Sequence, residues 1–105
     1  MGFAENLAAL PASDHLTGIE MVAADGHIER VENRPGSAGS VRIYAYLAGK
    51  YGGIDAAAAN EGLALYAEHS DDARVHPGKH PNIDRLLDVA VGGGVWRVIL
   101  IPAEP

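Results

Sequence analysis

The feature that most constrains the fold is a hairpin pattern near the N-terminus. Asp25-Gly26 separates two β-prone stretches, Ile19–Ala24 and His27–Glu32. Asp-Gly accepts the positive φ angles that a tight turn between antiparallel strands needs. Apolar side chains alternate along the first stretch, which predicts that one face of the hairpin is buried. Other parts of the chain must therefore cover one face of a small sheet.

The C-terminal end supplies a second β pattern. The stretch Val95–Ile101 is nearly all apolar and β-prone, and it lies between three glycines and Pro102. A continuous apolar run of this length is typical of a strand that is covered on both faces. We therefore expect a small sheet made of the N-terminal hairpin and a C-terminal central strand.

Helical periodicity accounts for most of the remaining chain. Asp55 is a good N-cap for an alanine-rich helix in which Gly62 permits close packing against a neighbour. Pro81 and Asn82 are typical of a helix start, with Asn82 suited to the N-cap. Helices are expected through Phe3–Leu10 and over about 41–51, 56–68 and 81–90.

The predicted order of elements is α-β-β-α-α-α-β. This order defines an α+β fold in which three to four helices cover a single small sheet. The chain has 105 residues, of which 48% are hydrophobic, enough to bury a core in one domain spanning residues 1–105. A three-stranded sheet leaves two open edges, so a homodimer that joins the same edge of two copies is expected.

Composition excludes several classes of function. Cysteine is absent, which excludes disulfides, thiolate metal sites and cysteine nucleophiles. The net charge is -6, and the eight basic side chains are scattered, so we expect no nucleic-acid partner. No apolar run is long enough to cross a bilayer, and the N-terminus does not look like a secretion signal. We expect a cytoplasmic protein without a membrane partner or a cofactor.

The polar segment His69–Asp84 is the first candidate for a functional site. It gathers three of the five histidines with carboxylates and two cations. Such side chains ligate metals, titrate near neutral pH or hold anions. The candidate residues for binding a ligand or partner are His69, Asp72, His76, Lys79, His80, Asn82, Asp84 and Arg85.

Three kinds of chemistry fit this segment. His76, His80 and Asp84 offer two histidines and a carboxylate for a metal, although Pro77-Gly78 breaks the helix that would align the histidines. Lys79, His80 and Arg85 surround a predicted helix start, where free N–H groups favour an anion. His69 or His80 beside Asp71, Asp72 or Asp84 fits a general base oriented by a carboxylate. An exposed loop followed by an ordinary helix start is the alternative to all three.

A glycine- and serine-rich connection is the second candidate. It runs from the hairpin into a predicted helix, as loops that cradle phosphate do, but it lacks the Gly-Lys-Ser/Thr ending of a P-loop. Turn and capping residues would also explain it. The residues of this anion-loop hypothesis are Arg34, Gly36, Ser37, Gly39 and Ser40.

The chain resembles a small bacterial family known only as a domain of unknown function. The resemblance runs over nearly the whole length and implies a small soluble bacterial domain, without catalytic residues to carry over. Its blocks are Phe3-Ala-Glu-Asn-Leu7, Pro35-Gly36 with Gly39-Ser40, Lys50-Tyr-Gly-Gly-Ile54, Glu61-Gly-Leu-Ala-Leu-Tyr-Ala-Glu-His69 and Pro77-Gly-Lys-His-Pro-Asn-Ile-Asp-Arg-Leu86.

Two functional hypotheses follow from these patterns. The first is a non-enzymatic binding or interaction domain, which contacts a protein partner or a small acidic ligand through the His69–Asp84 segment. The alternative is a small metal-dependent or acid–base enzyme that acts on a small anionic substrate, with a histidine as ligand or base.

Overall fold

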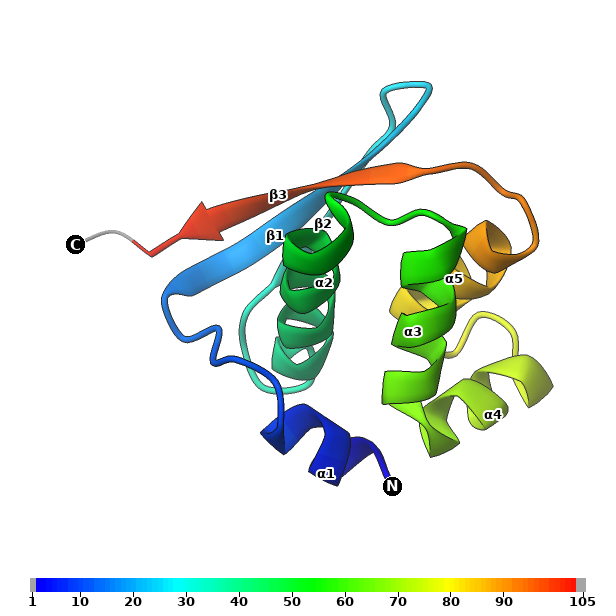
Figure 1. Ribbon diagram of the computed structural model, residues 1–105, viewed down its shortest axis with the longest axis horizontal. Helices are drawn as coiled ribbons and strands as arrows, with labels where there is room; N and C mark the ends of the chain where they lie inside the picture. Colours follow the sequence, from blue (N-terminus) through cyan, green and yellow to red (C-terminus); the bar gives the residue numbers. More distant parts are fainter. Residues whose placement is uncertain (1, 104–105) are drawn as a thin grey trace.

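The computed structural model describes residues 2–103 and shows an α+β fold (Figure 1). A three-stranded antiparallel sheet lies across one side of the molecule, and the helices lie against a single face of it. The elements are α1 (Phe3–Ala8), β1 (Leu16–Ala23), β2 (Ile28–Glu32), α2 (Ala38–Tyr51), α3 (Ala56–Tyr66), α4 (Glu68–Val75), α5 (Pro81–Ala90) and β3 (Trp96–Pro102). The predicted fold class and order are confirmed, with α4 as one additional helix.

The predicted hairpin is confirmed. β1 pairs antiparallel with β2, and the Ala23 N–H donates to the His27 carbonyl over 2.8 Å. Gly26 has a φ of 92°, a conformation that glycine adopts without strain. The Asp25 carboxylate accepts a 2.9 Å hydrogen bond from the His27 N–H and fixes the turn. Local chemistry alone therefore explains this part of the fold.

The prediction that the C-terminal strand is central was wrong. The sheet order is β2-β1-β3, so β1 is the central strand and β3 is an edge. Along β3, Trp96 and Val98 are half-buried, whereas Ile99 and Leu100 are 42% and 41% exposed. Hydropathy shows how apolar a strand is but not how many strands lie beside it. The apolar run at the C-terminal end was therefore wrongly predicted to be a central strand.

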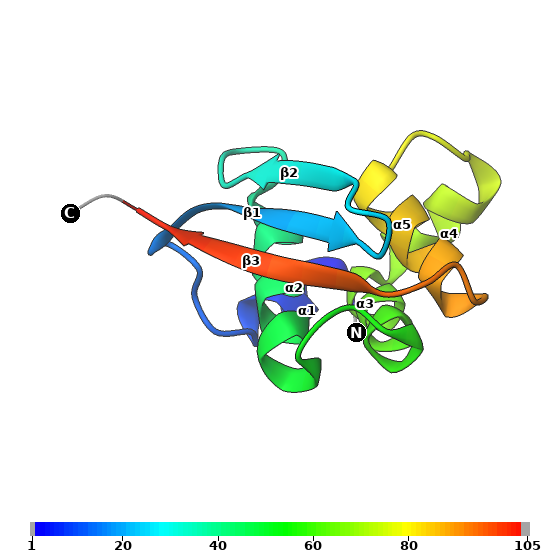
Figure 2. The same ribbon diagram turned by 90° about the horizontal axis from the view of Figure 1, so that it is seen from above.

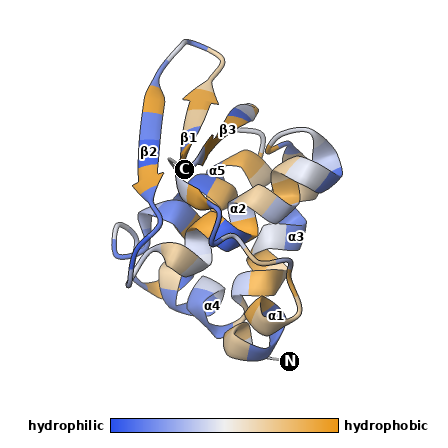
Figure 3. Ribbon diagram, turned by 90° about the vertical axis from the view of Figure 1, so that its left-hand side faces the viewer, coloured by the Kyte–Doolittle hydropathy of each residue, from blue (hydrophilic) through white to orange (hydrophobic). Residues whose placement is uncertain are grey.

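The core lies between the sheet and the helices. Ile19 and Met21 of β1 are fully buried against Tyr44 and Leu47 of α2 within one hydrophobic cluster. Seen from above, the three strands lie in front of the helices (Figure 2). Figure 3 shows hydrophobic and hydrophilic segments along β2, and of its two hydrophobic residues Val31 is buried whereas Ile28 is 55% exposed.

Helix α3 begins and ends through local backbone chemistry. Asp55 caps it as predicted, because its carboxylate accepts a 2.8 Å hydrogen bond from the Ala58 N–H. A Cβ at Gly62 would lie 2.7 Å from Leu86 and 2.9 Å from Leu47, so the predicted close packing is also confirmed. The helix ends at Tyr66 because Ala67 takes a φ of 52°, and α4 follows at once.

The His69–Asp84 segment is thus part helix and part loop. Its first residues lie on α4, and its last ones lie in the first turn of α5. The predicted break at Pro77-Gly78 is confirmed, since α4 ends at Val75 and α5 begins at Pro81. His80, and not Asn82 as predicted, occupies the N-cap position. Pro81 takes the first helical position, where an N–H would have no partner within the helix and proline is therefore favoured.

Candidate ligand-binding site

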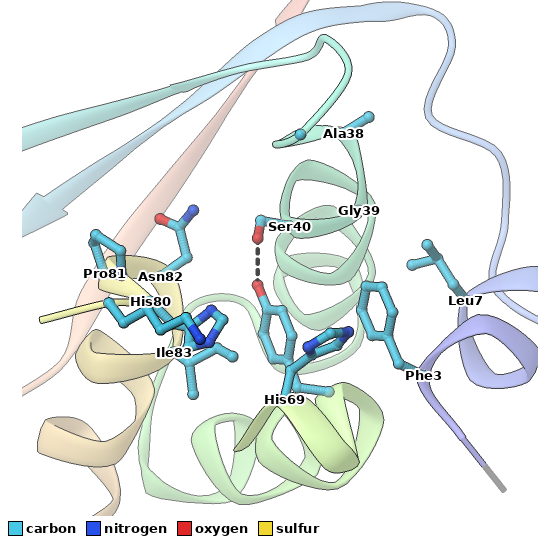
Figure 4. Close-up of a pocket in the computed structure, with 13 residues that line it drawn as sticks. Phe3, Leu7, Ala38, Gly39, Ser40, His69, His80, Pro81, Asn82 and Ile83 are labelled. Carbon is cyan, nitrogen blue, oxygen red and sulfur yellow. Dashed lines mark hydrogen bonds between the residues drawn. The ribbon is translucent and has the colours of Figure 1, made fainter. Parts of the chain in front are cut away.

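A pocket of about 440 Å³ brings the two predicted segments together (Figure 4). They are the glycine- and serine-rich connection before α2 and the His69–Asp84 segment, which lie about thirty or more residues apart in the sequence. Helix α1 closes one side of the pocket. The lining residues are Phe3, Leu7, Gly36, Ala38, Gly39, Ser40, Tyr66, His69, Lys79, His80, Pro81, Asn82 and Ile83.

The first turn of α2 forms the wall nearest to α1. A Cβ on Gly39 would lie 3.0 Å from the Phe3 ring and 3.3 Å from the Leu7 side chain, so glycine permits α1 to pack closely here. Ser37 lies outside the lining and its hydroxyl donates to the Glu32 carbonyl, which anchors the loop to β2. Arg34 is exposed and lies outside the lining as well.

Aromatic side chains form the apolar side of the pocket. The Phe3 ring stacks with the Tyr66 ring at 5.8 Å between centroids and meets the His69 ring edge-on at 4.7 Å. The Tyr66 hydroxyl donates to Ser40 Oγ over 2.6 Å, shown by the dashed line in Figure 4. Burial raises the pKa of Tyr66, so the phenol stays a neutral donor. The proton of the Ser40 hydroxyl then remains for another acceptor.

Asp72 on α4 organises the polar side from just behind the lining. Its Oδ2 lies 2.6 Å from His80 Nε2 and 3.0 Å from Lys79 Nζ, and its Oδ1 lies 3.8 Å from His76 Nε2. The hydrogen bonds from His80 and Lys79 lower the pKa of Asp72 to about 2. The carboxylate is therefore ionised at neutral pH and holds both side chains at the mouth of the pocket.

The ionised state of Asp72 settles which nitrogen of His80 carries a proton. A carboxylate only accepts hydrogen bonds, so the Nε2 of His80 must donate to it. In the neutral ring the opposite nitrogen, Nδ1, then has a free lone pair. The His69 ring lies 6.0 Å from the His80 ring between centroids, so two imidazoles share the pocket.

Two of the predicted residues serve the scaffold. Asp84 accepts a 2.9 Å hydrogen bond from the Gly78 N–H and ties the loop to α5. Arg85 is only 8% exposed, and it donates to Glu29, to the Tyr44 hydroxyl at 3.0 Å and to Asn82 Oδ1 at 3.0 Å. Neither side chain lines the pocket. Burial raises the pKa of Tyr44 to about 12, so this buried phenol is neutral.

The predicted metal ligands are bonded to other groups or face solvent. His80 is bonded to Asp72, His76 is exposed, and Asp84 is bonded to the loop backbone. Within residues 2–103, no three histidine, aspartate or glutamate side chains form a group that could hold a metal ion.

Sequence reasoning did not identify the apolar half of the pocket. Phe3, Leu7, Tyr66 and Ile83 were not among the predicted site residues, because apolar side chains at helical spacing look like an ordinary core face. Nothing local distinguishes a residue that packs against the core from one that packs against a ligand. Of the predicted site residues, the pocket gathers His69, Lys79, His80, Asn82, Gly36, Gly39 and Ser40.

The fold and the pocket define a class: a small α+β domain whose single sheet supports a mixed apolar and cationic pocket between helices. A family model described as an uncharacterized protein conserved in bacteria (DUF2322) matches residues 3–99, so the chain belongs to this family and the resemblance is confirmed. No curated protein and no solved structure matched the chain. None of the helices within residues 2–103 is long and apolar enough to cross a membrane.

Proposed function

We propose that the chain is a non-enzymatic binding domain that holds a small anionic molecule with an apolar part. One observation carries the proposal: the pocket places Lys79 and His80 opposite an apolar wall that includes Phe3. Its volume of about 440 Å³ lies in the range of small-molecule sites, which combine apolar walls with a few polar groups. A protein partner that presents an acidic side chain is the other form of this proposal.

The polar groups suit an acceptor ligand. Lys79 has three N–H donors, and Asp72 engages it through a single 3.0 Å contact, so donors remain for a ligand oxygen. The Ser40 hydroxyl and the N–H groups of Gly39, Ser40 and Asn82, in the first turns of α2 and α5, are further donors beside the same space. The N–H donors at these helix starts supplement the cationic side chains, which are the main support for the proposal.

Thermal unfolding in the presence of candidate ligands tests this function. A ligand that binds only the folded state raises the Tm. We expect a higher Tm with phenyl phosphate or benzoate, and a weaker effect with inorganic phosphate, which lacks the apolar part. An unchanged Tm with all of these compounds would contradict the proposal.

The two lysines of the chain form a matched pair of variants for the same experiment. Lys79→Gln and Lys50→Gln each remove one charge and one carboxylate contact, because Lys50 pairs with Glu61 at 2.7 Å. Lys79→Gln should lose most of the ligand-induced rise in Tm, and Lys50→Gln should keep it. Equal effects of both substitutions would show that the rise reflects net charge and not the pocket.

An acid–base enzyme is the second candidate, favoured by the 2.6 Å contact between His80 and Asp72. A histidine oriented by a carboxylate is a common general base, and proton transfer of this kind needs no metal. Mass spectrometry of a bound compound after incubation separates the two candidates. Conversion of the compound that is lost in His80→Gln would identify an enzyme, and an unchanged compound supports the binding domain.

Three further expectations concern assembly, location and partners. We propose that the protein forms a homodimer and resides in the cytoplasm, and that nucleic acid is not its partner. The net charge of -6 supports the last point, because phosphate backbones repel a surface of this charge. The absence of cysteine is compatible with a reducing compartment.

A further inference from the structure

On the edge of β3 that faces away from β1, backbone groups have no neighbouring strand within residues 2–103 to pair with. The Trp96 N–H donates to the Ile54 carbonyl over 3.1 Å and the Trp96 carbonyl accepts from the Ile54 N–H over 2.8 Å, on the side of β3 that faces away from β1. Backbone groups alternate in direction along a strand. Those of Val98 and Leu100 therefore also point to the free side, while Arg97, Ile99 and Ile101 bond to β1.

Only a short part of this edge is free to pair with another strand, because both of its ends are blocked. Ile54 covers Trp96 at one end, and Pro102 at the other end has no N–H to offer. Two residues, Val98 and Leu100, thus carry unpaired donors and acceptors in an apolar stretch. The opposite edge of the sheet, β2, instead carries Glu29, Arg30 and Glu32, charges of the kind that protect an edge from pairing.

We propose that the β3 edge binds the β3 edge of a second copy, in antiparallel register with Ile99 on the two-fold axis. In this register Val98 lies opposite Leu100 of the second copy, and all four free backbone groups of each copy are paired. The chain of the second copy turns away from the edge at Pro102, because Ile54 already occupies the free side of Trp96. A register centred on Leu100 would set Val98 opposite Pro102, which has no N–H to return the bond. The result is a continuous six-stranded sheet.

The side chains of the two copies that meet across this axis can pack against one another. On one face Val98 meets Leu100, and on the other face Ile99 meets its own copy, while Arg97 lies opposite Ile101 and not opposite another cation. Ile99 and Leu100 are 42% and 41% exposed and would become covered. A hollow of about 420 Å³ below the same edge, lined in part by Pro11, Ala45, Tyr46 and Leu100, adds apolar surface next to the joint.

Cysteine cross-linking tests the register, because the chain has no cysteine of its own. The two Ile99 residues would form a non-hydrogen-bonded pair with Cα atoms about 4.5 Å apart, within the range of a disulfide. Ile99→Cys should yield a covalent dimer under mild oxidation. Arg97→Cys, on the same face two residues away, should stay uncross-linked. Equal cross-linking of both variants, or none of Ile99→Cys, would overturn the proposal.

Light scattering with size-exclusion chromatography tests the dimer without a cross-link. The unaltered chain should have twice the mass of the 11.0 kDa monomer. Ile99→Lys would place two ammonium groups side by side on the axis and should give a folded monomer. Ile28→Lys, at the 55% exposed Ile28 of β2, should remain dimeric. A monomeric unaltered chain, or a dimer that survives Ile99→Lys, would refute this interface.

Discussion

At the scale of single residues, Asp72 has the most connected position in the candidate site. It lies behind the pocket lining and contacts His80, Lys79 and His76, all from the loop that joins α4 to α5. The pocket mouth is therefore positioned by a residue that does not itself line it. A ligand would meet Lys79 and His80 in orientations that Asp72 has already selected.

This arrangement predicts a pH dependence of stability. The pKa of Asp72 is lowered from an ordinary 3.8 to about 2, first by the hydrogen bond from His80 and then by that from Lys79. A lowered carboxyl pKa contributes stability that is present above about pH 4 and is lost as the pH falls through 2. Between pH 6 and pH 2 the Tm should fall more for the unaltered chain than for Asp72→Asn.

The neighbouring carboxylate provides the control for this measurement. Asp71 is exposed and contacts Arg74 at 3.2 Å on the surface of α4. Asp71→Asn removes the same charge from the same turn without touching the loop, so its Tm should follow that of the unaltered chain over the whole pH range. A parallel course of Asp72→Asn and the unaltered chain would disprove the role of Asp72.

At the scale of elements, the junction of α3 and α4 turns the chain so that His69 and Asp72 face the loop before α5. Ala67 makes this turn with φ 52° and ψ -116°, and within residues 2–103 it is the one non-glycine residue with a positive φ. Backbone strain of this kind costs about 1–3 kcal/mol and is concentrated at functional sites. Its place directly before α4 fits a need to orient that helix.

Ala67→Gly should therefore stabilise the fold. Glycine adopts this conformation without strain, while its greater freedom in the unfolded chain costs roughly 0.5–1 kcal/mol. We expect a net gain of about 1 kcal/mol in the free energy of unfolding, measured with urea.

The matched control is Ala64→Gly in the exposed interior of α3. This substitution should destabilise by about 0.5–1 kcal/mol, because the residue has ordinary helical geometry there. A loss of stability in both variants would show that Ala67 is not strained.

At the scale of the whole molecule, the two proposed surfaces use different parts of the fold. The pocket lies among the helices below the sheet, and its lining contains no residue of β3, whose free edge lies along the sheet itself (Figure 1). Arg85 of α5 donates to the Tyr44 hydroxyl of α2 and to Glu29 of β2, and these bonds join the two helices that line the pocket to each other and to the sheet. Ligand binding and self-association are thus separate properties of one core.

Binding should accordingly survive the loss of the dimer. We expect the monomeric Ile99→Lys variant to show the same ligand-induced rise in Tm as the unaltered chain, measured for each relative to its own ligand-free Tm. A rise that disappears together with the dimer would mean that the second copy contributes to the pocket.

The sequence by itself determined the elements with local causes. Asp25-Gly26 specifies the hairpin, Asp55 caps α3, and Pro77-Gly78 separates the helices on either side, because each depends on nearby backbone chemistry. The polar residues of the pocket were also predictable as two candidate segments. Helix α4 was missed because its sequence, Glu68–Val75, is too polar to show a clear apolar face.

Only the tertiary structure decided how distant segments meet. It placed β3 at the edge of the sheet, turned Arg85 into the core and set Phe3 and Tyr66 beside Ser40 to complete the pocket. The physical reason is that these outcomes depend on the packing of elements far apart in the chain. Periodicity and capping act within a few residues and carry no information about which faces come together.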